Sequence, residues 1–225
     1  MIALGGGVTS ALLTGAALSH AGDKALEDVP EYTRKPTTFQ AAKKDYGTDV
    51  GYMQSRNFDS AMVVPKQDIT KAYDNTSSEK LKILLRRAKE HGLVITGEGY
   101  RRPGIVEHEI GHAIAKNTGT PWEKFTQGRA APVLGTLAGI AGLGAGLHAG
   151  RKWGPVAGGL AGLGISGLGN IPNIHGEMIA NQYAKELLPE GTKSVSTWPF
   201  LGSYVNAGVT APTVAGALAG LLGHK

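Results

Sequence analysis

Four stretches of the chain lack charged side chains and are long enough to cross a bilayer as helices: residues 1–22, 130–150, 153–176 and 194–224. They are rich in Gly and Ala, and small residues recur at every fourth position, as in Gly154, Gly158 and Gly162. This spacing places the small residues on one side of a helix, where they let two helices approach closely within lipid. In water each glycine would cost a helix about 1 kcal/mol relative to alanine. We therefore expect membrane-inserted helices.

Most of the charged side chains lie between the first two apolar stretches. The chain carries 23 basic and 18 acidic residues, and no basic run is interleaved with aromatic residues, so no nucleic-acid partner is expected. The absence of cysteine excludes a disulfide scaffold and a thiol nucleophile. Five parts are predicted. They are an apolar helix (1–22), a charged part (23–129), an apolar helical hairpin turning near Arg151-Lys152 (130–174), a helix that contributes with 104–116 to a common site (175–193) and a C-terminal apolar helix (194–225).

The charged part is predicted to mix short strands with helices. Residues 23–60 contain several Pro and Gly residues and are expected to form loops and short extended runs. Short strands are predicted at 61–64 and 93–96, and an amphipathic helix at 77–91, followed by Gly92. The basic face of that helix is either solvated or laid against anionic lipid. The predicted fold class is α+β and mostly helical.

The chemically most informative residues are His108, Glu109 and His112, on a predicted helix over 104–116. Histidines four residues apart lie one turn apart on the same helix face, where both imidazoles can bind one zinc ion. Glu109 lies between them, so that its carboxylate can take a proton from an activated water molecule. The spacing predicts a zinc site with Glu109 as the catalytic base.

A third ligand must come from another part of the chain. The acidic residues after Glu123 are Glu177, Glu186 and Glu190, and the last two are expected to be solvated at a helix end. Glu177 is expected to open a helix of its own, with Ala180 and Ala184 on the same face. These small side chains would let that helix pack closely against another helix.

Two further residues near Glu177 have more than one interpretation. His175 follows a predicted loop over 170–174 and is either a ligand, a donor to the transition state or, as we favour, a loop residue. Tyr183 either donates to a developing oxyanion or packs within its helix.

The order of these motifs resembles that of membrane gluzincins of the HtpX-like and CAAX-prenyl-protease type. The resemblance covers residues 104–188 and rests on His108-Glu109-x-x-His112, two apolar segments, and Glu177-Met178-Ile179-Ala180-Asn181. It implies a zincin-like catalytic part, with the apolar segments as a membrane hairpin between the two halves of a zinc site. Asn181 stands where such families usually have Asp, and it could still accept a hydrogen bond from a ligand imidazole.

The sequence therefore predicts a membrane-embedded zinc metalloendopeptidase, with a peptide or protein as substrate. The protein is expected to be multi-pass. Its catalytic part is expected in the cytoplasm, because the basic residues are concentrated in residues 23–129. The strand over 93–96 is expected to be an edge with which extended substrate pairs. The Gly-rich helices also allow a homo-oligomer.

A second hypothesis makes the Gly-zipper helices the main function. The chain would then be a membrane-inserting structural or pore component, for instance one delivered by a phage virion, and virion-associated before insertion. Its zincin domain would be accessory or inactive. Weak, Gly-rich spans favour this hypothesis because they could remain soluble in a particle and insert later.

Overall fold

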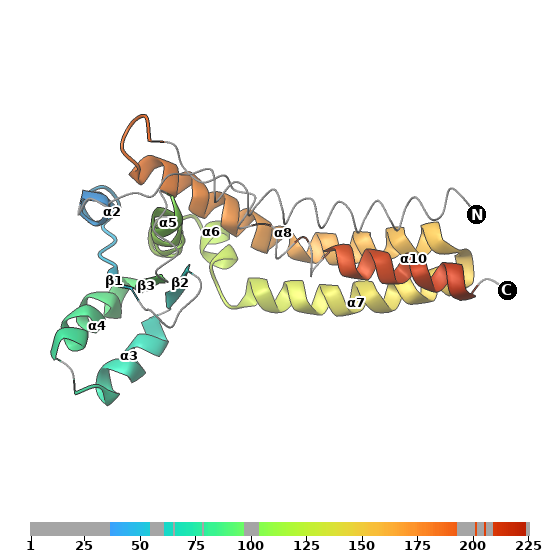
Figure 1. Ribbon diagram of the computed structural model, residues 1–225, viewed down its shortest axis with the longest axis horizontal. Helices are drawn as coiled ribbons and strands as arrows, with labels where there is room; N and C mark the ends of the chain where they lie inside the picture. The colour runs from blue at the N-terminus through green and yellow to red at the C-terminus, as the bar shows by residue number, and fades with distance from the viewer. Residues whose placement is uncertain are drawn as a thin grey trace. The chain divides into compact units, whose positions relative to one another are not determined.

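The computed structural model has an α+β fold that is mostly helical, with a small mixed sheet (Figure 1). It describes residues 37–54, 61–64, 66–77, 79–96, 104–192, 201, 205 and 209–223. The helices are α2 (Thr37–Tyr46), α3 (Lys66–Asn75), α4 (Glu79–His91), α5 (Ile105–Thr118), α6 (Pro121–Thr126), α7 (Ala130–Trp153), α8 (Pro155–Leu187) and α10 (Ala211–Gly223). The strands are β1 (Gly51–Gln54), β2 (Ala61–Val64) and β3 (Leu93–Thr96). The apolar helix predicted at 1–22 lies outside the described residues.

The described residues divide into two units, and the division passes through α8 between His175 and Gly176. One unit, here called the helical unit, contains α7, the part of α8 up to His175, and α10. The other, here called the mixed unit, contains α2 to α6, the three strands and the rest of α8.

The sheet of the mixed unit has the strand order β1-β3-β2. β1 pairs parallel to β3, and β2 pairs antiparallel to it, with Val63 opposite Val94. The strands predicted at 61–64 and 93–96 are confirmed. The expectation that 93–96 forms an edge is wrong, because β3 is hydrogen-bonded on both sides and β2 lies at an edge.

Side chains of β3 alternate between two apolar clusters, one on each face of the sheet. Val94 packs with Val106, Ile110 and Ile114 of α5, whereas Leu93 packs with residues of α3 and α4. A strand with helices on both faces buries both of its sides, which explains its run of apolar residues. One face of the sheet thereby supports α5 through apolar packing.

Residues 23–60 contain more regular structure than the sequence predicted. The loop interpretation is wrong for α2, a helix of ten residues, whereas the four-residue strand β1 agrees with the short extended runs expected there. Pro36 directly precedes α2 and Gly47 follows it with φ +62°, so these residues bound the helix instead of breaking it. The amphipathic helix predicted at 77–91 is confirmed as α4, and Gly92 ends it with φ +109°.

In the helical unit, α7 and α8 are joined by a single glycine. The chain turns at Gly154, with φ +91°, instead of at Arg151-Lys152, which are the last turn of α7. The loop predicted over 170–174 is also wrong, as α8 continues through Pro172 to Leu187. Glu177 therefore does not open a helix but lies within one.

Bare glycine surfaces bring the three helices of this unit together. A β-carbon at Gly142 of α7 would lie 2.9 Å from the carbonyl oxygen of Gly162 in α8. A β-carbon at Gly158 of α8 would lie 2.7 Å from Cα of Gly150 in α7, and would also meet the backbone of Gly216 in α10. The backbones approach so closely that these positions admit no larger residue.

The large apolar side chains of these helices point outward. Leu137 and Ile140 of α7 are 59% and 64% exposed, and Leu160 and Leu168 of α8 are 63% and 70% exposed. Among the described residues, α7 is the one helix that is long and apolar enough to cross a membrane.

The glycine contacts predict a sharp difference between two substitutions in α8. Gly158→Ala should destabilise the helical unit by about 1–3 kcal/mol, because the new methyl group overlaps the backbones of α7 and α10. Gly164→Ala is the matched control: nothing lies within 4 Å of its β-carbon, and alanine favours the helix by about 1 kcal/mol. Thermal unfolding followed by circular dichroism should show the first variant melting lower and the second no lower than the wild type. Equal shifts would contradict this packing.

Candidate metal centre

The helix α5 holds the two histidines in a fixed direction because its other faces are buried. It begins after Gly104, whose φ of +91° suits glycine. Glu107 closes the first turn, since its carboxylate accepts a hydrogen bond from the Gly104 N–H at 2.9 Å. Ile110 and Ile114 are fully buried against the sheet and α2. The helix predicted over 104–116 is thus confirmed, with its end at Thr118.

Close packing of α5 against α8 brings Glu177 to the histidines. A β-carbon at Gly111 would overlap the carbonyl group of Ala180, with 2.9 Å to its carbon. Ala180 and Ala184 are buried, as their predicted role in helix packing requires. Gly111 is a part of this contact that the sequence interpretation missed, although it lies between Glu109 and His112.

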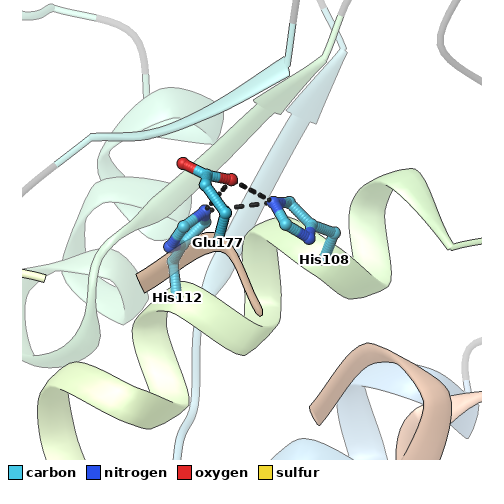
Figure 2. A group of neighbouring side chains, drawn as sticks. All are labelled: His108, His112 and Glu177. Carbon is cyan, nitrogen blue, oxygen red and sulfur yellow. Dashed lines mark hydrogen bonds and ion pairs between the residues drawn. The ribbon is translucent and has the colours of Figure 1, made fainter. Parts of the chain in front are cut away.

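His108, His112 and Glu177 direct one donor atom each toward a common point (Figure 2). Nε2 of His108 lies 2.9 Å from Oε2 of Glu177 and 3.2 Å from Nε2 of His112. Nε2 of His112 lies 3.5 Å from the same carboxylate oxygen. The side chains are 1%, 20% and 12% exposed for His108, His112 and Glu177, so the group is largely shielded from solvent.

Gln127 orients His112 and was not found by sequence reasoning. The Nδ1 atom of His112 lies 2.6 Å from Oε1 of Gln127, an acceptor that fixes the proton on Nδ1 and directs Nε2 toward Glu177. The Nε2 amide of Gln127 donates to the carbonyl oxygen of Gly176 at 3.1 Å. One side chain therefore links a histidine of α5 to the residue before Glu177. A single Gln after a short helix carries no recognisable sequence signal.

Glu109 lies beside the group on the side of the edge strand β2. Its carboxylate accepts a hydrogen bond from the backbone N–H of Val63, and it is 7% exposed. Burial raises the pKa of Glu109 to about 7, against the opposing effect of His112. A carboxyl group with a pKa near neutrality can both accept and release a proton.

The two histidines have opposite pKa shifts. Burial lowers the pKa of His108 to about 4. Burial also disfavours the charge on His112, but Glu177, Glu109 and the Gln127 hydrogen bond together raise its pKa to about 9. The same histidines hold the pKa of Glu177 well below its usual range despite burial. The raised pKa means that protonation of His112 stabilises the metal-free fold. This contribution is complete below about pH 6.5, the pKa of an unfolded histidine, and is lost as the pH rises through 9.

Three further residues were candidates for a role at the site: Asn181, Tyr183 and His175. Asn181 is buried one turn after Glu177 on α8, and its hydrogen bond to a ligand imidazole stays a prediction. Tyr183 packs edge-on against Tyr46, with ring centroids 5.4 Å apart, and borders the apolar cluster below α5. His175 lies within α8, so its interpretation as a loop residue is wrong.

No family model, curated protein or solved structure matches the chain. The resemblance to membrane gluzincins therefore rests on the motifs themselves.

The site predicts that the two imidazoles differ in protonation in the metal-free protein. At pH 7, His112 should carry protons on both nitrogens and His108 on one only. Long-range ¹H–¹⁵N correlation spectra of the imidazoles measure this directly. Gln127→Ala should lower the pKa of His112, because it removes a hydrogen bond to the charged ring. A neutral His112 at pH 7 in the wild type would contradict the arrangement.

Proposed function

We propose that the chain is a membrane-embedded, zinc-dependent metalloendopeptidase. The observation that carries the proposal is the spacing of the three donor atoms, 2.9, 3.2 and 3.5 Å from one another. Two ligands about 2.0–2.1 Å from a tetrahedral zinc ion lie about 3.3 Å apart, so the donors already have nearly the required separation. Two imidazoles and a carboxylate are also the donor set of hydrolytic zinc sites, which keep a fourth position open.

The proposed chemistry assigns one role to each side chain. A zinc ion held by His108, His112 and Glu177 would supply a Lewis acid that polarises the scissile carbonyl group and acidifies water. Glu109, which is not among the three donors, takes the proton from the attacking water. It then delivers that proton to the nitrogen of the leaving amine, which a carboxyl group with a pKa of about 7 can do.

The position of β2 at an edge of the described sheet favours an extended peptide as the substrate. Among the described strands, β2 pairs with β3 alone, on one side. The N–H of Val63, opposite Val94 in this pairing, donates to Glu109. A peptide pairing with this edge would therefore pass next to the catalytic base. We therefore propose β2, and not the strand at 93–96, as the edge that pairs with substrate.

The helical unit supports the membrane part of the proposal. Glycines such as Gly142, Gly150 and Gly158 face the neighbouring helices, and large apolar residues such as Ile140 and Leu168 face outward. This arrangement is the reverse of a soluble core and suits helices surrounded by lipid. We propose that α7 and the first part of α8 form a membrane hairpin, with α10 packed against it, in a multi-pass protein whose mixed unit faces the cytoplasm.

The same packing favours a second candidate, in which membrane insertion by the helical unit is the function and the metal centre is accessory or inactive. The two candidates differ in whether hydrolysis depends on Glu109.

Glu109→Gln is the direct test of the enzymatic proposal. The amide cannot accept a proton, so zinc-dependent cleavage of unfolded casein should fall by about 10²- to 10⁴-fold while the metal content is unchanged. Glu190→Gln is the matched control, since Glu190 is exposed and outside the site. Turnover in Glu109→Gln equal to that of the wild type would remove Glu109 as the base. Absence of zinc-dependent cleavage by the wild-type protein would favour the second candidate.

A further inference from the structure

The short helix α6 presents two aromatic rings to solvent. Trp122 and Phe125 lie one turn apart on the same face, with stacked rings whose centroids are 5.4 Å apart. They are 45% and 37% exposed, so the stacked pair forms a contiguous apolar patch on the mixed unit. Lys124 lies between them in the sequence and is also exposed.

The conformation of α6 is strongly fixed despite its six residues. Thr120 and Glu123 form a reciprocal capping box, in which the Thr120 N–H donates to Glu123 at 2.6 Å and the Glu123 N–H donates to the Thr120 hydroxyl at 3.3 Å. Pro121 occupies the first turn. Because such a short helix is unstable in isolation, the caps and packing against α5 hold it. The exposed rings are therefore part of a rigid surface.

A short connection joins α6 to the apolar helix α7. Thr126 ends α6 and Ala130 begins α7, and the four peptide links between them reach at most about 14 Å. α7 has 24 residues and is about 36 Å long, slightly more than a hydrocarbon core of about 30 Å. Its far end carries Trp153, which is 62% exposed, and Lys152, whose Nζ lies 5.0 Å from the indole centroid.

Along the chain, aromatic and basic residues thus flank both ends of one apolar helix. Tryptophan is enriched at membrane interfaces because its ring is apolar while its N–H remains hydrated. We propose that the Trp122–Phe125 pair inserts into the headgroup region of the bilayer and anchors the mixed unit to the membrane surface. This inference rests on the membrane part of the proposed function.

The anchor also has a consequence for the metal centre. The chain leaves α6 directly into Gln127, whose amide binds both His112 and Gly176. An α6 helix held at the lipid surface would therefore keep the site close to that surface. The substrates that it favours are then peptide segments next to a membrane.

The test uses the full-length chain reconstituted in phosphatidylcholine and phosphatidylglycerol vesicles. The chain has three tryptophans, so variants that keep Trp122 alone or Trp153 alone are made by Trp→Phe substitution. Quenching is measured with lipids brominated near the headgroup or deep in the acyl chain. Trp122 should show blue-shifted emission and a larger loss of emission with the shallow quencher than with the deep one.

Two comparisons make the outcome decisive. Trp153 alone should also be quenched, because it belongs to α7. If Trp153 is quenched and Trp122 is not, the anchor is wrong and membrane insertion stands. If neither is quenched, the membrane proposal itself is wrong. Ile83→Trp in a tryptophan-free chain, at a 62% exposed position of α4, should be insensitive to both lipids. Quenching there without quenching of Trp122 would make α4 the lipid-facing surface and overturn the inference.

Discussion

The absence of a β-carbon at Gly111 is the constraint on which the candidate site depends. Only a bare backbone at this position lets α8 lie against α5 closely enough for Glu177 to reach the two histidines. The same principle governs the helical unit, where Gly142, Gly158 and Gly216 allow similarly close contacts. Small residues thus position both the chemistry and the helices that accompany it, because helix separation is set by the side chains between the helices.

The electrostatics of the site follow from burying several ionisable groups in a small volume. Burial alone would neutralise all of them, as the pKa values of His108 and Glu109 show. Glu177 and His112 instead keep opposite charges because each compensates the other. A dication would replace the proton of His112 and satisfy the three converging donors at once, and this exchange makes metal affinity dependent on pH.

The sequence predicted the parts of the fold in which a local pattern determines the outcome. The spacing of His108 and His112 implied a shared helix face, and the apolar run at 93–96 implied a strand, although its central place in the sheet was not foreseen. Pro36 and Gly47 misled the interpretation of α2, because residues that interrupt a helix also bound one. Pro172 suggested a loop, yet α8 continues through it from Pro155 to Leu187. Gln127 could not be predicted, since its role depends on two elements that meet only in the folded chain.

The metal content of the purified protein tests the central claim most directly. After equilibration with zinc and removal of excess metal, mass spectrometry of the metal should give one zinc ion per wild-type chain. His108→Ala, His112→Ala and Glu177→Ala should each lose most of this zinc, since each donor belongs to one convergent group. His175→Ala, two residues before Glu177 on the same helix, should retain it. Zinc retained in the histidine double variant, or lost from His175→Ala but not from Glu177→Ala, would contradict the proposed site.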